Sequence, residues 1–346
     1  MSRPAAAPSA RRAPRRAGAG LRAAVWQLLL LGAVAGVAVF LIATLFDNLA
    51  ARRVATGFGF LNEEAGFAIG ESLLAYSPTD TYLYAIGVGL LNTLFVAAAG
   101  AVLATLLGLI VGLARLARNS LVSGVAGAYI ELMRNIPLLL QLLFWYALFT
   151  EALPRPRHAW EPIAGVFLSN RGMHLPWPAH EAGQAWWAGW SWQLPALDGF
   201  NFVGGLTLSP ELAALLTGLV LYTAAFMAEI VRAGVQAVGK GQRQAGTALG
   251  LKRTQVMRAI VLPQALRIIV PPMTSQYLNL TKNSSLAVAI GYPDLVSVVN
   301  TAILQTGQAV EGVLIIMAAY LTVSLAISLL MNLYNHRLTR KGQRNA

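Results

Sequence analysis

The sequence predicts an all-α membrane protein with about six transmembrane helices. Of its 346 residues, 56% are hydrophobic and only 12% are charged, whereas a soluble domain carries about a quarter charged residues. Six apolar segments are long enough to cross a hydrocarbon core, which takes about 20 helical residues. The chain has no cysteine, which excludes disulfides and thiolate metal sites.

The six apolar segments are the predicted spans. The first has an apolar core of about 22 residues, longer than the roughly 7–15 residues of a cleaved signal sequence, so we expect an uncleaved anchor. The third is expected to begin before its apolar core, near Val122, with Glu131 and Arg134 in its first half. The fifth is interrupted by polar residues. The apolar cores are residues 25–46, 86–113, 136–153, 212–230, 268–290 and 313–333.

The distribution of positive charge predicts the orientation of these spans. With the N-terminus in the cytoplasm, 19 Lys and Arg residues fall in cytoplasmic segments and 5 in external loops. Loops that stay in the cytoplasm carry such an excess. We therefore expect a multi-pass protein with both termini in the cytoplasm. The same topology accounts for the net charge of +12, so a nucleic-acid partner is not expected.

The second long external loop, residues 154–209, is called the insertion from here on. It is rich in tryptophan, and tryptophans clustered next to membrane spans usually form an interfacial aromatic belt. That interpretation is favoured, and a docking face for an external protein is the alternative. The tryptophans are Trp160, Trp177, Trp186, Trp187, Trp190 and Trp192.

Residues 244–263 form a basic amphipathic segment between the fourth and fifth spans. Ala245, Ala248 and Leu249 share one helical face, because they are spaced three and four residues apart. Gly250 permits a left-handed turn, and a second short helix then runs to Pro263. Two short helices with a small apolar face suit insertion into a groove of a partner protein. An ordinary solvated loop would need no such face.

Residues 234–240 match the spacing of a phosphate-binding loop, G-x-x-x-x-G-K. The context argues against that function, because position 241 is Gly and the preceding element is a membrane helix rather than a strand. The four histidines match no metal-binding motif. We therefore expect this chain to bind neither nucleotide nor metal.

The segment 244–263 resembles the EAA loop of ATP-binding cassette importer permeases, which reads E-A-A-x-x-x-G-x9-I-x-L-P. Gln244 replaces the Glu and Gly246 replaces the second Ala, so the salt bridge of a Glu is lost. The resemblance implies that residues 232–265, the coupling loop from here on, contact an ATP-binding subunit. The residues implied in that contact are Gln244, Ala245, Gly246, Ala248, Leu249, Gly250, Ile260, Leu262 and Pro263.

Further segments resemble the polar amino-acid branch of these permeases, the histidine and glutamine type. The front of the chain is similar to the general L-amino-acid importers of Gram-negative bacteria, through TGFGFL at 56–61 and YSPTDTY at 76–82. The likeness therefore covers nearly the whole chain. The other matching segments are GLLNTL at 89–94, YIELMRNIPLLLQ at 129–141, EIVRAG at 229–234 and KNSSL at 282–286.

The resemblance implies the transmembrane domain of a type I importer in the bacterial inner membrane. A second permease subunit, expected to be a different chain, would complete the path, and a periplasmic amino-acid-binding protein would deliver L-amino acids. ATP and Mg²⁺ would be held by the ATP-binding subunit, with no cofactor and no enzymatic activity on this chain. The expected regions are a basic tail at 1–24, an extra helix and external loop at 25–85, the transmembrane domain at 86–335 and a cytoplasmic tail at 336–346.

Polar residues within the spans are candidates for contact with the solute, because such groups are costly in a membrane and face a bundle interior or a wet cavity. Lys282 suits an α-carboxylate, although it and its polar neighbours could equally bond between helices. Glu131 and Arg134 are expected to form a structural ion pair. The candidates along the path are Lys282, Asn283, Ser284, Ser285, Asn279, Gln141, Asn92, Thr93 and Tyr222.

A secondary transporter or channel for small polar solutes is the main alternative function. It would need a carboxylate or an ion relay at mid-span, and the central spans carry none. A membrane enzyme would need a cluster of acids, histidines or nucleophiles at one membrane face, and the sequence predicts none.

Overall fold

The computed structural model describes residues 17–51, 56–180, 187 and 189–343. The chain divides into two units, Met1–Thr56 and Gly57–Ala346. The described part of the first unit is a single long helix, α1 (Ala17–Ala51). Its apolar stretch Ala24–Thr44 has the length and composition of a membrane span, as the sequence predicts.

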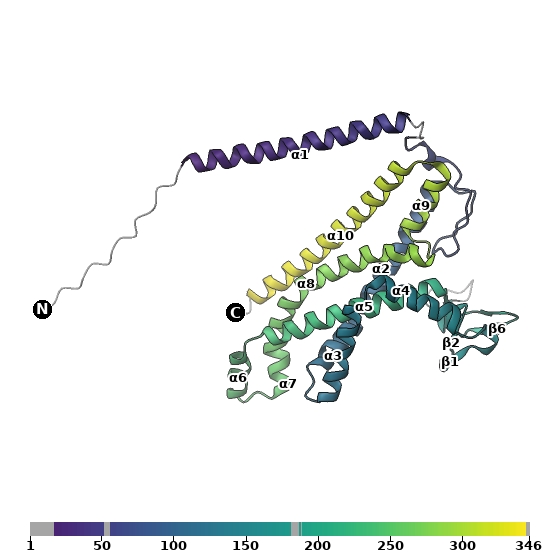
Figure 1. The fold of residues 1–346 in the computed structure, drawn as a ribbon. Coiled ribbons are helices and arrows are strands. Elements are labelled where there is room, and N and C mark those ends of the chain that lie inside the picture. Colours follow the sequence, from purple (N-terminus) through teal and green to yellow (C-terminus); the bar gives the residue numbers. More distant parts are fainter. Residues whose placement is uncertain (1–16, 52–55, 181–186, 188, 344–346) are drawn as a thin grey trace. The chain divides into compact units, whose positions relative to one another are not determined.

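The second unit is a helical bundle that carries a small group of strands (Figure 1). Helix α5 is central, because it contacts α2, α3, α4 and α8, whereas α10 packs on α8 and α9. The helices are α2 (Tyr82–Arg115), α3 (Ser120–Asn135), α4 (Leu138–Ala147), α5 (Pro210–Ala237), α6 (Lys240–Ala248), α7 (Arg253–Val256), α8 (Leu262–Asn283), α9 (Leu295–Thr306) and α10 (Ala309–Gln343).

Small residues let α2 and α5 approach closely. A Cβ on Gly108 would stand 2.7 Å from the Met227 Cβ, and a Cβ on Gly112 would stand 2.8 Å from the Ala228 carbonyl oxygen. Without water between helices, close backbone contact is what stabilises membrane bundles. The glycine pair in the second predicted span therefore serves helix packing.

The prediction of about six spans is confirmed. Among the described residues, five helices are long and apolar enough to cross a membrane, and the pair α3 and α4, bent by 102°, is the sixth if it forms one broken span. The break has a local cause. Pro137 prevents a continuous helix, and Ile136 before it adopts an extended conformation with φ −94° and ψ 128°, as residues before proline tend to do.

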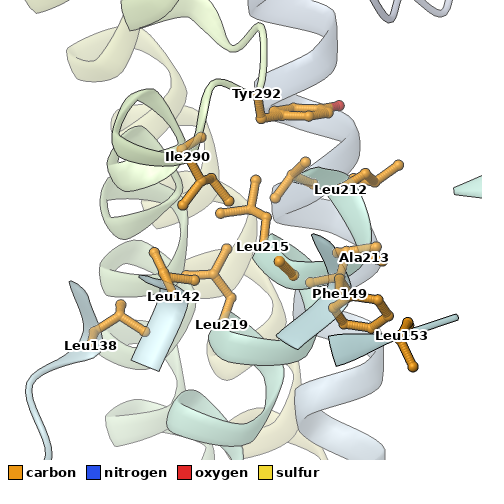
Figure 2. Close-up of a cluster of buried hydrophobic side chains, with 14 residues drawn as sticks. Leu138, Leu142, Phe149, Leu153, Leu212, Ala213, Leu215, Leu219, Ile290 and Tyr292 are labelled. Carbon is orange, nitrogen blue, oxygen red and sulfur yellow. The ribbon is translucent and has the colours of Figure 1, made fainter. Parts of the chain in front are cut away.

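Apolar side chains from α4, α5 and the region before α9 hold the broken span in place (Figure 2). Leu142 of α4 and Leu215 and Leu219 of α5 are fully buried there. Phe149 and Leu153 extend the cluster along the π-helical turn η2 (Leu148–Ala152) and its C-cap. On the other side, Tyr292 follows the short 3₁₀ helix η5 (Ser284–Ile290).

The insertion folds into short antiparallel strands, which the sequence did not predict. Strands β1, β2, β3 and β8 form a four-stranded sheet in that order, and β4–β5 and β6–β7 form two separate hairpins. The strands are β1 (Trp160–Ile163), β2 (Val166–Ser169), β3 (Gly172–Leu175), β4 (Trp177–His180), β5 (Trp190–Gln193), β6 (Ala196–Asp198), β7 (Asn201–Val203) and β8 (Leu206–Leu208).

The four-stranded sheet is fastened to the bundle. Its residues Leu168, Met173 and Leu208 pack against the cluster of Figure 2, and β3 and β8 contact α5. Phe202 of β7 covers the opposite face, with its ring 4.7 Å from that of Phe167. The class of the protein remains a helical membrane bundle, to which the strands are an addition.

Candidate functional site: the coupling loop and the polar face of the bundle

The coupling loop forms two short helices around a glycine turn, as predicted. Helix α6 ends at Ala248, and Gly250 follows with φ +78°, in the left-handed region. Helix α7 then continues through the π-helical turn η4 (Met257–Val261) into α8. The second half of the loop is therefore continuous with a span, since Arg253–Ile290 forms one helical stretch.

The inner side of the loop is a small apolar core. Gly246 is buried against η4, and a Cβ at this position would stand 2.8 Å from the Ile260 Cδ1 and 3.0 Å from the Val256 Cγ2. Val256 and Val261 are buried as well. Gly246 and Ile260 therefore hold the two halves of the loop together, so that their side-chain positions face the loop's own interior.

The outer side of α6 presents the predicted apolar face. Ala245 and Ala248 are exposed, and Leu249 has 79% of its surface exposed. Gln244 is exposed beside them, and its carbonyl oxygen accepts a hydrogen bond from the Thr247 hydroxyl. Helix α6 thus carries an unpaired apolar patch that suits a partner's groove.

The Arg243 side chain fixes the loop to the end of α5. The Arg243 Nη2 donates to the Val235 carbonyl oxygen at 2.6 Å, and within α5 itself Arg232 forms a salt bridge with Glu229. Residues up to Ala237 belong to α5, so the G-x-x-x-x-G-K segment is helical over most of its length. It does not form the loop that cradles a phosphate.

The predicted ion pair between Glu131 and Arg134 is wrong. Arg134 lies over the Phe226 ring of α5, with its Cζ 5.1 Å from the ring centroid, and Glu131 is exposed. Spacing of three residues allows contact on one helical face, but an aromatic ring on a neighbouring helix offers the guanidinium a cation–π contact. The ring of Phe226 lies 4.9 Å from that of Tyr222, another path candidate.

Two of the path candidates have a structural role instead. The Asn92 Nδ2 donates to the carbonyl oxygens of Glu71 and Pro293, each at 2.9 Å. The Thr93 Oγ1 accepts from the Leu295 backbone N–H at 3.0 Å. Both side chains are buried. They tie α2 to the start of α9, and contact with the solute stays a prediction for both.

Gln141 stabilises the break between α3 and α4. Its Nε2 donates to the carbonyl oxygens of Met133 at 2.9 Å and Ile136 at 3.0 Å, and only 4% of the residue is exposed. Backbone groups freed by a broken helix must be satisfied within a membrane. The Gln141 carboxamide, which suggested contact with the solute, therefore donates hydrogen bonds to the free backbone carbonyls at the break.

The polar residues of the fifth span separate into two groups. Ser284 and Ser285 donate to backbone carbonyls of their own helix, and Asn283 is partly buried. Asn279 and Lys282 are exposed, together with Ser275, which the sequence reading missed. The spacing of four and three residues puts Ser275, Asn279 and Lys282 on one stripe of α8. This stripe is called the polar face of α8.

A pocket of about 400 Å³ lies at the insertion end of the bundle, also unforeseen from sequence. Glu71, Ser209 and Glu211 line it, and the Ser209 hydroxyl donates to the Glu71 carboxylate. Burial raises the pKa of Glu71, against the lowering effect of that hydrogen bond. Its residues are far apart in sequence, so no local motif could have revealed it.

At one end of the membrane bundle, a loop carries an exposed apolar patch. This loop is continuous with a span that has a polar face. These features are typical of the membrane subunit of a transporter that is driven by another protein. The chain belongs to the family of binding-protein-dependent transport system inner membrane components, whose model matches residues 104–340. It is therefore a multi-pass inner-membrane protein. ATP hydrolysis belongs to a separate subunit.

Relatives of this chain are named as permeases of amino-acid transport systems. It is 44% identical to the putative amino-acid ABC transporter permease protein YhdX of Escherichia coli K12, with 92% of this chain and 94% of that protein covered. It is 41% identical to the general L-amino acid transport system permease protein AapQ of Rhizobium johnstonii, with 84% and 86% covered. A crystal structure of an amino acid ABC transporter with histidines matches with a TM-score of 0.54 and 25% identity, over 74% of this chain and 95% of that one.

Proposed function

We propose that this chain is a permease subunit through which L-amino acids enter the cell, powered by ATP hydrolysis on a partner. The partner, an ATP-binding subunit, binds the coupling loop and also binds ATP and Mg²⁺. This chain itself binds no cofactor. A second, different permease chain completes the path, and a periplasmic binding protein delivers the amino acid. Both termini lie in the cytoplasm, in agreement with the excess of Lys and Arg on that side.

The continuity between the coupling loop and the polar face of α8 carries this proposal. The apolar patch on α6 packs through Gly246 onto Val256 and Ile260. That segment continues without a gap into α8. When the partner subunit binds and moves α6, this movement would therefore be transmitted to the span α8 and would not be absorbed in a flexible linker.

The polar face of α8 supports a solute path on that side of the bundle. An exposed Lys282 within a span would be costly against lipid. It is tolerated where the helix lines water or faces another protein subunit. An ammonium beside the Asn279 carboxamide suits the carboxylate that all α-amino acids share. The second permease chain would close this side of the path.

Reconstitution tests the proposal. The chain should be co-expressed with candidate ATP-binding and permease subunits, purified and placed in proteoliposomes, and uptake of labelled amino acids measured with and without ATP. We expect uptake only when ATP, the ATP-binding subunit and the binding protein are all present. Uptake by this chain alone, driven by an ion gradient, would instead support a secondary transporter.

A further inference from the structure

The insertion, which carries the β4–β5 hairpin, is joined directly to a membrane span. Strand β8 ends at Leu208 and the membrane helix α5 begins at Pro210, so there is no linker between the insertion and the span. The sheet contacts α5 directly, and the strands lie beside the ends of α4 and α5 (Figure 1). The base of the insertion is therefore held at the level where the spans leave the hydrocarbon.

The register of the hairpin puts tryptophans on both of its faces. Pro178 of β4 pairs with Trp192 of β5, and the adjacent Trp177 pairs with Gln193. Because side chains alternate between faces along a strand, Trp177 and Trp192 point to opposite sides. Trp192 is 72% exposed and Trp177 is 51% exposed. The neighbouring β6–β7 hairpin differs, since its Phe202 is stacked on the sheet.

The charge of the hairpins is unusual for a soluble surface. Residues 172–209 contain no Lys and no Arg. The β4–β5 hairpin therefore has no basic side chain of its own that would attract anionic lipid or an acidic protein. Tryptophan is the side chain that is enriched at the boundary between membrane and water, where its indole lies among the headgroups.

Exposed tryptophans on both faces favour lipid over protein as the contact. A flat docking partner would cover one face of a two-stranded hairpin and leave the other in water. A headgroup layer surrounds the hairpin and contacts both faces. Exposed apolar side chains also occur on α4, where Leu140 and Phe144 are 56% and 59% exposed.

From these observations we propose that the β4–β5 hairpin is an interfacial membrane anchor. It immerses Trp177 and Trp192 in the headgroup region of the leaflet on the insertion side. The anchor fixes the insertion against the bilayer beside α4 and α5. This inference does not depend on which solute the protein carries.

The absence of cysteine allows a direct test. A nitroxide label would be placed at Ser191→Cys in the hairpin, and separately at Ser72→Cys in the loop before α2, where the residue is exposed. The full chain in its assembled complex would be studied in nanodiscs. Spin relaxation by oxygen, which concentrates in lipid, would be compared with relaxation by a water-soluble nickel chelate.

The label at Ser191→Cys should respond mainly to oxygen, and the label at Ser72→Cys mainly to the nickel chelate. Adding Trp177→Ser and Trp192→Ser to the hairpin should shift its label toward the nickel chelate by several-fold. Leu73→Ser, an exposed apolar residue of the other loop, should leave the hairpin label unchanged.

A hairpin label that responds to the nickel chelate from the outset would overturn the anchor. So would a label that becomes shielded only when a periplasmic binding protein is added, which would assign the hairpin to protein docking. Neither readout requires transport, so failure of the anchor and failure of the proposed function are distinguishable.

Discussion

Gly246 and Ile260 meet in the core of the coupling loop, where a Cβ at position 246 would stand 2.8 Å from the Ile260 Cδ1. This contact joins α6 to η4 and, through η4, to α8. The two halves of the loop approach so closely that a residue larger than alanine would force them apart.

Enlarging position 246 should uncouple the loop. Gly246→Val forces Val256 and Ile260 apart, and overpacking of this kind costs about 1–3 kcal/mol. Gly246→Ala should have a small effect, because the atom it meets is the end of a flexible side chain. Amino-acid uptake and ATP hydrolysis would be measured together in proteoliposomes. The Val variant should keep hydrolysis and lose uptake, and intact uptake would contradict the coupling role of this contact.

An acidic side chain on the outer face of α6 should abolish transport without preventing membrane insertion. Ala245→Glu would place an unpaired carboxylate inside the partner's groove, which is strongly unfavourable. Uptake should fall more than about tenfold, the change that 1.4 kcal/mol produces. Ser120→Glu provides a matched control, because Ser120 is exposed at the start of α3. Normal uptake by Ala245→Glu would exclude α6 from the partner contact.

Removing the charge from the polar face of α8 should weaken solute handling more than assembly. Lys282→Met keeps the length of the side chain and loses a charge-assisted hydrogen bond, which contributes about 1.5–3 kcal/mol. The KM for uptake should rise by about tenfold or more, while co-purification with the partner subunits is unchanged. Val288→Met, at an exposed apolar position after α8, is the control. Equal effects of the two variants would leave Lys282 with a packing role only.

Loss of the Gln141 carboxamide should destabilise the broken span. Gln141→Leu leaves the Met133 and Ile136 carbonyls without their donor, and each unsatisfied buried group costs about 1–3 kcal/mol. Thermal unfolding in detergent should therefore occur at a lower Tm than in the wild type. Leu139→Ala removes an exposed side chain of the same helix and should change the Tm less. A Gln141→Leu protein as stable as the wild type would show that the break needs no side-chain cap.

The insertion should lose stability in acid because of His174. This side chain is buried beside Thr207, with its Nδ1 3.0 Å from the Thr207 Oγ1, and burial lowers the pKa of His174 below its ordinary 6.5. The folded insertion thus disfavours the protonated imidazole. Stability is retained above pH 6.5 and declines as the pH falls from there toward the lowered pKa of the folded state.

Limited proteolysis of the insertion between about pH 8 and pH 5 measures this effect, because this range brackets the pKa of free histidine, about 6.5. Cleavage should accelerate in the acid half of the range for the wild type, and His174→Gln should flatten the profile. His158→Gln, at an exposed position, should retain the wild-type profile. A flat wild-type profile would exclude His174 as the titrating group.

The sequence by itself determined the membrane class, the approximate spans and the coupling loop. Span prediction succeeds because crossing a bilayer requires a continuous apolar helix, which composition alone reveals. The loop was predictable because its features are local. The spacing of Ala245, Ala248 and Leu249 and the turn at Gly250 involve residues close together in the chain.

Only the tertiary structure decided what the polar residues of the spans do. Asn92 and Gln141 were expected along the solute path and Arg134 in an ion pair with Glu131. In the structure their partners are a distant carbonyl, the carbonyls at a helix break and a neighbouring ring. A polar group in a span must be satisfied, but the sequence does not say by which partner. The strands of the insertion were hidden for a related reason, because segments of three or four residues become strands only when another segment pairs with them.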